Sequence, residues 1–216
     1  MNTMEKETLI EHWEAVYKKQ EDHQKASWYQ EEPGVVFEWL KALPERSGLS
    51  VIDIGAGDSY FVDQALKEGF YDITALDLSA HALEKAKKRL GKRASEVRWI
   101  CSDVTQFSPS RTYQVWHDRA TFHFLHSEEA LKAYKKVLQT ALKPRGYLVL
   151  ATFSEDGPDR CSGLPVRQYD VKTLQSYLGA NFELIEHTFY DHQTPGGKIQ
   201  NFIYTLFRRV TAPETL

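Results

Sequence analysis

Short apolar runs alternate with amphipathic stretches through the middle of this chain. Each run is rich in β-branched or other apolar residues and is too short for a helix, as in a strand buried on both faces. Because strands and helices alternate, the pattern predicts a mostly parallel sheet with helices on both faces and right-handed crossovers. The five runs are LSVIDIG, ITALDL, VRWICSD, YQVWHD and GYLVLATF.

The helices between these runs have their own start and stop signals. Gly69 is expected to stop the helix FVDQALKEG, and Ser79 to cap the next one, which ends before Gly91. Ser127 and two glutamates open another helix, which Pro144 and Gly146 are expected to close.

Both ends of the chain differ from this core. Residues 4–20 carry apolar side chains at helical spacing, and a second helix is predicted over Val35–Leu43. After a helix capped by Asp170, the runs FELIEHTFY and KIQNFIYTLFRR predict an antiparallel hairpin. We therefore expect a single domain with an N-terminal helical extension or lid (1–48), a core (49–153) and a C-terminal part (154–216).

Composition narrows the classes of protein. With 216 residues, 27 basic and 30 acidic side chains, the chain fits one domain, and its net charge of −3 disfavours bulk nucleic acid as a partner. No apolar run is long enough to span a membrane, and the first residues do not resemble a secretory signal, so we expect a cytoplasmic protein. No feature indicates an oligomeric state.

Two cysteines and a histidine cluster are the candidates for disulfide or metal chemistry. Cys101 and Cys161 are expected to be free thiols, with Cys161, on a loop, the more exposed. The spacing of His117, His123 and His126 matches no zinc pattern, so no metal is expected.

The first apolar run ends in a glycine turn that leads into a helix. In Asp53-Ile54-Gly55-Ala56-Gly57 the glycines let a ligand approach the backbone closely. Asp77 follows the next strand, 22 residues after Gly55, where a carboxylate can hold ribose hydroxyls. Together these features indicate an adenosine-type cofactor.

The charges of the turn favour one such cofactor over another. Asp53 and Asp58 would repel the pyrophosphate of a dinucleotide, and Tyr60 stands where a dinucleotide site has its third glycine. S-adenosylmethionine (SAM) instead presents an ammonium and a sulfonium. The alternatives are an NAD(P)-dependent oxidoreductase and a non-catalytic cofactor-binding module.

Residues 49–153 resemble the core of class I SAM-dependent methyltransferases, and the segments HWEAVY, SWYQ and WHDRATFHFL resemble a subgroup of small bacterial methyltransferases. The resemblance implies a Rossmann-like, doubly wound, seven-stranded sheet and transfer of a methyl group to an O, N or S atom of a small molecule or protein. It places Asp53 and the loop residues beside the methionine portion, Asp77 at the ribose, and the residues after the second and third strands at the adenine. The implied cofactor-binding residues are Asp53, Gly55, Ala56, Gly57, Asp58, Ser59, Asp77, Leu78, Asp103, Val104 and His117. Asp58-Ser59 stands where this family commonly has Thr-Gly or Ser-Gly.

The segment after the fourth strand carries the catalytic candidates, His117, Asp118, Arg119 and His123. A histidine can act as a general base near neutral pH, and Arg119 can bind an anionic group of a substrate. The alternative is that Arg119 pairs with Asp118 and only fixes the loop.

Aromatic residues of the extension are candidates for a lid. Trp28 and Tyr29 are predicted to lie over the sulfonium, because aromatic faces stabilise cations. The alternative is that they pack the extension onto the sheet, and packing is the preferred interpretation for Trp13.

Overall fold

The computed structural model describes residues 3–20, 22–44 and 48–210. Parts of the predicted N-terminal extension (1–2, 21 and 45–47) and of the predicted C-terminal part (211–216) lie outside the described residues. In the part of the chain that is described, no helix is long and apolar enough to cross a membrane.

Seven strands form one sheet in the order β3, β2, β1, β4, β5, β9, β8. The pairs from β3 to β5 are parallel, whereas β9 is antiparallel to both β5 and β8. This arrangement confirms the predicted mostly parallel sheet and its C-terminal hairpin. The strands are β1 (Ser50–Ile54), β2 (Asp72–Asp77), β3 (Val97–Cys101), β4 (Tyr113–Arg119), β5 (Leu142–Phe153), β8 (Phe182–Gln193) and β9 (Ile199–Arg209); β6 (Arg160–Cys161) and β7 (Leu164–Pro165) form a separate small hairpin.

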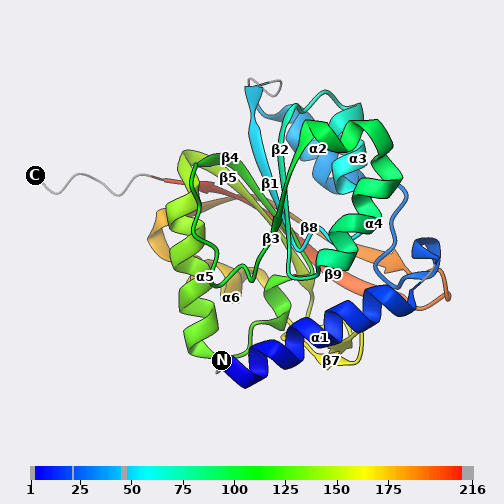
Figure 1. The fold of residues 1–216 in the computed structure, drawn as a ribbon. Coiled ribbons are helices and arrows are strands. Elements are labelled where there is room, and N and C mark those ends of the chain that lie inside the picture. The colour runs from blue at the N-terminus through cyan, green and yellow to red at the C-terminus, as the bar shows by residue number, and fades with distance from the viewer. Residues whose placement is uncertain (1–2, 21, 45–47, 211–216) are drawn as a thin grey trace, which may run out of the picture.

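Helices cover both faces of this sheet, as predicted (Figure 1). Side chains of α2, α3 and α4 pack into one buried cluster, and those of α5 and α6 into a second cluster on the opposite face. The helix α1 belongs to neither layer. The helices are α1 (Thr3–Lys19), α2 (Gly34–Ala42), α3 (Phe61–Lys67), α4 (Ala80–Leu90), α5 (Glu128–Ala141) and α6 (Val171–Leu178), with short 3₁₀ turns η1 (His23–Lys25), η3 (Gly91–Glu96), η4 (Phe122–Phe124) and η5 (Gly179–Asn181).

One predicted boundary is wrong. The helix α5 ends at Ala141, and Pro144 and Gly146 lie within β5 instead of closing the helix. The register between β4 and β5 shifts between Tyr113 and Val115, so Pro144 falls in an irregular part of the pairing, where its missing N–H costs little. A side chain at Gly146 would meet the carbonyl of Gln114, so glycine lets the two strands approach.

The pairing of the central strands sets which side chains meet above the sheet. Asp53 of β1 lies opposite His117 of β4. Arg119 lies opposite Ala151 of β5, which in turn lies opposite Tyr204 of β9. Because paired residues point to the same face, Asp53 and His117 form one neighbouring pair, and Arg119 and Tyr204 face each other across a small residue.

Candidate functional site

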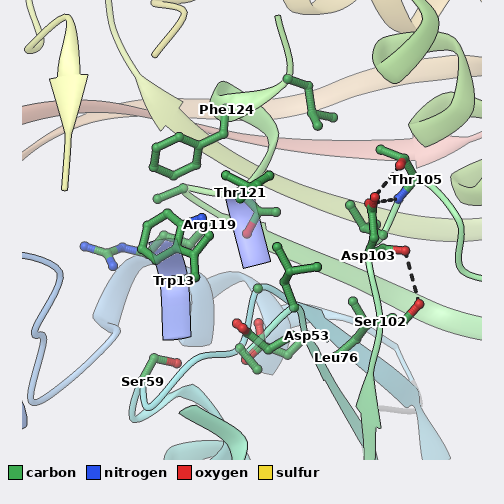
Figure 2. A pocket seen from close by; sticks show the side chains of 18 of the residues that line it. Trp13, Asp53, Ser59, Leu76, Ser102, Asp103, Thr105, Arg119, Thr121 and Phe124 are labelled. Carbon is green, nitrogen blue, oxygen red and sulfur yellow. Dashed lines mark hydrogen bonds between the residues drawn. The ribbon is translucent and has the colours of Figure 1, made fainter. Parts of the chain in front are cut away.

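A cavity of about 620 Å³ lies where the parallel strands end, with α1 along one side. Open α/β sheets bind their ligands beyond the carboxyl ends of the strands. The lining comes from α1, the glycine turn after β1, the ends of β2, β3 and β4, the turn η4, the start of α5 and the hairpin β6–β7. Figure 2 shows Asp53 between two groups of lining residues, Asp103 with Thr105 on one side and Arg119 with Trp13 and Phe124 on the other.

The glycine turn takes the tight conformation that its sequence predicts. Gly55 and Gly57 have φ angles of 63° and 54°, which favour glycine. A side chain at Gly55 would collide with the Thr121 hydroxyl, and one at Gly57 with the Tyr17 hydroxyl. Both glycines therefore let side chains from other elements press against the backbone of the turn.

Replacing Gly57 by alanine is expected to lower the free energy of unfolding by about 2 kcal/mol, because the left-handed backbone and the contact with Tyr17 both disfavour a Cβ atom. For a chain of this length that corresponds to a fall in Tm of roughly 4–8 °C in thermal denaturation. Gly34→Ala is the control, since nothing lies near its Cβ position. Equal Tm values for the two variants would contradict this account of the turn.

Asp77 both shapes the turn and lines the cavity. Its Oδ2 accepts the N–H of Gly57 at 2.8 Å and its Oδ1 accepts the N–H of Ser79 at 2.7 Å. Burial raises the pKa of Asp77 to about 6, although both N–H groups act in the opposite direction. The carboxylate thus joins the ends of β1 and β2 and keeps further lone pairs for a ligand.

Asp53 and His117 form a buried pair on neighbouring strands. The Nδ1 of His117 lies 2.7 Å from the Oδ1 of Asp53, and the imidazole stacks on the ring of Phe61 with 4.0 Å between centroids. A carboxylate only accepts, so Nδ1 is the donor. The Nε2 of His117 and the Oδ2 of Asp53 are both buried and have no hydrogen-bond partner among the described residues. The Nε2 of His117 and the Oδ2 of Asp53 are therefore both available to accept a hydrogen bond from a ligand.

The far end of the cavity is formed by residues after β2 and β3. Asp103, Val104 and Leu78 all line it, as the resemblance implies. The Oδ1 of Asp103 accepts from both the N–H and the hydroxyl of Thr105, at 2.8 and 2.7 Å, which fixes the carboxylate and leaves Oδ2 available.

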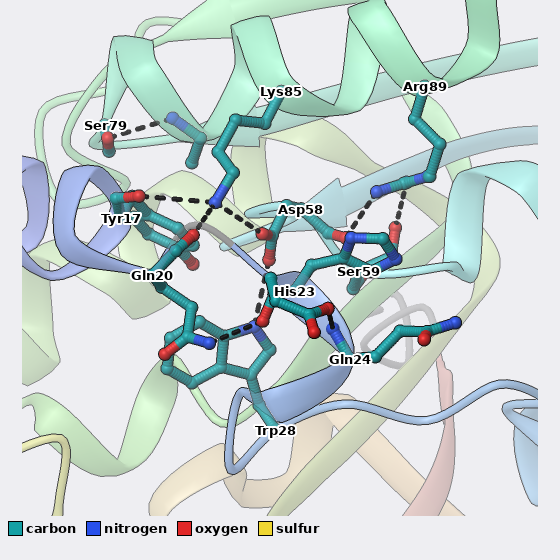
Figure 3. A network of polar contacts seen from close by, with 12 residues as sticks. Tyr17, Gln20, His23, Gln24, Trp28, Asp58, Ser59, Ser79, Lys85 and Arg89 are labelled. Atoms are coloured by element: carbon teal, nitrogen blue, oxygen red, sulfur yellow. Dashed lines mark hydrogen bonds and ion pairs between the residues drawn. The ribbon is translucent and has the colours of Figure 1, made fainter.

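Trp28 and Asp58 belong to a network of polar contacts beside the cavity (Figure 3). The indole N–H of Trp28 donates to Asp58 at 3.0 Å, and the ammonium of Lys85 lies 3.5 Å from the other carboxylate oxygen. Lys85 also donates to the carbonyls of Tyr17 and Gln20 at the end of α1. The sequence predicts that Asp58 contributes negative charge to the site, and this is wrong. Asp58 lies outside the lining, and Lys85 offsets its charge.

Four other predicted site residues do not line the cavity, and one of them is Gly57, whose N–H is held by Asp77. Asp118 points to the opposite face of β4, as strand alternation requires, and accepts from the Tyr134 hydroxyl and from the N–H groups of Thr121 and Phe122. His123 is fully buried against Phe124 and Phe153, and burial lowers its pKa to about 3. Tyr29 packs on Tyr60.

The lining includes residues that the sequence did not single out for it. Trp13 packs on Phe124 as expected of a packing residue, with 5.2 Å between centroids, but also faces the cavity. Tyr17, Phe124 and Thr121 line it too. Trp13 and Tyr17 are four residues apart on one face of α1, a spacing that fits a buried stripe equally well.

The predicted exposure of the two cysteines is wrong, although both are free. Cys101 is exposed because β3 is the edge of the sheet. Cys161 is buried and lines the cavity, because the hairpin β6–β7 folds back over the sheet. Burial raises the pKa of the Cys161 thiol. In the described part of the chain, no three metal-ligating side chains come together.

Sequence comparison finds two kinds of relative. A family profile described as "Methyltransferase domain" matches residues 51–146. Malonyl-[acyl-carrier protein] O-methyltransferase of Priestia megaterium is 36% identical over 107 residues, which cover 49% of this chain and 37% of that protein. Human EEF1A lysine methyltransferase 2 is 26% identical over 210 residues, which cover 91% and 83%. The match therefore spans little more than a third of the bacterial relative and most of the human one.

Comparison of folds adds 1,6-didemethyltoxoflavin-N1-methyltransferase of Burkholderia thailandensis, solved with 1,6-didemethyltoxoflavin and S-adenosylhomocysteine (SAH). Its TM-score is 0.72 at 18% sequence identity, and the alignment covers 98% of this chain and 92% of that one. The profile match includes β1, the glycine turn, Asp77 and Asp103, which are the features that build one end of the cavity. The family profile and the sequence relatives agree that residues 51–146 match a methyltransferase domain, and the fold of the chain is that of solved SAM-dependent methyltransferases.

Proposed function

We propose that the protein transfers the methyl group of SAM to an O, N or S nucleophile of a small molecule or protein side chain. One observation carries the proposal. Three carboxylates, Asp53, Asp77 and Asp103, lie at or just after the ends of three neighbouring strands and line one cavity, and the Oδ2 of Asp53 is buried there with no partner among the described residues. In chain order, the proposed parts are a lid (1–48), a cofactor-binding core (49–153) and a substrate-binding part (154–216).

These residues suit the groups of the cofactor one by one. The Oδ2 of Asp53 would accept from the ammonium of the methionine portion, and Asp77 would accept from the ribose hydroxyls. Asp103 would accept from the adenine amino group, with Leu78 and Val104 against the ring. Trp28 and Tyr17 line the cavity with aromatic rings that stabilise cations.

The bound cofactor supplies a methyl group on a positively charged sulfur, and the protein has to orient the nucleophile, remove its proton and exclude water. His117 is the residue that would remove the proton of the nucleophile. Its Nδ1 is held by Asp53, so Nε2 is the nitrogen that can accept a proton from the acceptor. Asp118 and His123, behind the wall of the cavity, would only position the end of β4 with Arg119 and the following turn with Thr121.

The test of this function is calorimetric binding of SAM and SAH to the purified protein, followed by methyl transfer from labelled SAM to a panel of small molecules and proteins. Binding of both cofactors and transfer to at least one acceptor are expected. Binding without transfer to any member of the panel would favour a non-catalytic module, and absence of binding by both would exclude the function.

The affinity for SAH is expected to fall as the pH falls through about 6. Asp77 accepts from a ribose best when ionised, and with a pKa of about 6 it is mostly protonated at pH 5. If only the ionised form binds well, the Kd for SAH rises by about tenfold between pH 7 and pH 5. The measurement is calorimetry across this range. The Asp77→Asn variant, which cannot ionise, should show weaker binding with no such dependence, and a flat wild-type profile would contradict the assignment.

A further inference from the structure

Arg119 acts electrostatically on Asp53, but its guanidinium extends from β4 toward β9. Its Nε donates to the Tyr204 hydroxyl at 3.0 Å, and its guanidinium carbon lies 4.9 Å from the centre of the Phe202 ring, both on β9. Ala151 of β5 stands between Arg119 and Tyr204 in the register, and its small side chain lets the arginine pass. Two strand spacings, about 10 Å, separate β4 from β9, whereas the acids follow β1, β2 and β3 on the other side.

One nitrogen of this guanidinium lacks a partner. Nη1 donates to the carbonyl of Trp28 at 3.1 Å, but Nη2 is buried and makes no hydrogen bond to any described residue. A buried guanidinium N–H without an acceptor is costly, and a charged oxygen such as that of a carboxylate accepts the strongest hydrogen bond from it.

The charges of the lining are segregated. Its acids are Asp53, Asp77, Asp103 and Glu129, and among the described residues Arg119 is the only lysine or arginine of the lining. Figure 2 shows this separation, with Arg119 on the opposite side of Asp53 from Asp103. An anionic group entering the cavity is therefore attracted to the Arg119 end and repelled from the other.

The surroundings of Arg119 in the cavity are apolar. Trp13, Phe124, Trp28 and Cys161 line this end, and Trp13 packs edge to face on Phe124. Aromatic walls of this kind favour a planar or apolar body over an extended polar chain.

We propose that the methyl acceptor is a small molecule with an apolar body and a carboxylate, and that Arg119 binds the carboxylate through Nη2. The inference rests on the proposed methyl-transfer function and narrows its substrate class. A lysine side chain would bring its ammonium toward the guanidinium, so Arg119 disfavours a protein lysine as acceptor.

The test is calorimetric titration of the SAH-saturated protein with benzoate, phenylacetate and 3-phenylpropionate, each paired with its primary amide, and with phenethylamine. At least one carboxylate is expected to bind at least tenfold more tightly than its amide, and phenethylamine to bind more weakly still. In the Arg119→Gln variant the preference for the carboxylate should disappear, and in Arg119→Lys part of it should remain.

Cofactor binding separates this inference from the function on which it rests. Failure of wild-type protein to bind SAH would overturn the proposed function itself.

Methylthioadenosine, which lacks the amino-acid portion of SAH, distinguishes the two carboxylates that Arg119 can bind, that of the cofactor and that of the acceptor. If Arg119→Gln weakens SAH but not methylthioadenosine, Arg119 binds the cofactor's own carboxylate and the inference fails. It also fails if no carboxylate probe binds at millimolar concentration, or if amides bind equally well, and that comparison in the wild type needs no variant to fold.

Discussion

Replacing His117 by glutamine is expected to slow methyl transfer by about 100-fold or more, for an acceptor whose nucleophile carries a proton. The amide of glutamine can still donate to Asp53, but it cannot take up a proton. Because the buried carboxylate keeps a donor, the affinity for SAH should stay within about threefold of the wild type. The measurements are initial rates with labelled SAM across the pH range, and calorimetry with SAH.

The pH profile separates catalysis from mere support of the fold. With SAM saturating at every pH, so that weaker binding through Asp77 does not contribute, removal of a general base should abolish the acidic limb of kcat, whereas a purely structural role would lower kcat equally at every pH. His187→Gln is the matched control, because His187 lies exposed on the edge strand β8. If SAH affinity and rate fall by the same factor in His117→Gln, the histidine acts through Asp53 on cofactor binding, and the proposed proton transfer is wrong.

Replacing Asp77 by alanine is expected to weaken SAH binding by about 100-fold, or roughly 2.7 kcal/mol, within the range of one to two charge-assisted hydrogen bonds. The variant loses the acceptor for the ribose. It also frees the N–H groups of Gly57 and Ser79, so the turn beside the ligand is no longer held. The measurement is the Kd for SAH of the variant and of the wild type, by calorimetry.

A carboxylate on the same strand offers a control for this variant. Asp72 stands at the opposite end of β2, where it pairs with Arg98 and Arg111, and it is remote from the cavity. Asp72→Ala should change the affinity for SAH by less than about threefold. A loss of less than about tenfold in Asp77→Ala would remove the ribose contact from the proposed site.

The fold followed closely from the sequence because its signals are local. Each buried strand is one apolar run, and Ser79, Ser127 and Asp170 cap helices as their positions predict. The end of α5 was predicted wrongly because it depends on a non-local contact. Whether Pro144 stops a helix or lies in a bulged strand depends on the pairing of β4 with β5, which leaves no mark within the segment itself.

The site was predictable where one strand end supplies a residue and unpredictable where two elements meet. Asp53, Asp77 and Asp103 reach the cavity because every parallel strand ends at the same edge. Cys161 and Trp13 reach it only because the hairpin β6–β7 and α1 fold over that edge. Asp118 differs again. Its exclusion follows from alternation along β4, and a stricter count of the faces of YQVWHDR would have separated it from His117 and Arg119.

The ammonium of Lys85 holds the end of α1 and the glycine turn at once, through the carbonyls of Tyr17 and Gln20 and through Asp58. One side chain, Lys85, therefore stabilises the positions of both α1 and the glycine turn. A displacement of α1 from this position would break these contacts and leave the buried carboxylate of Asp58 without its counter-ion. The position of α1 and the conformation of the glycine turn are therefore coupled through a single ammonium group.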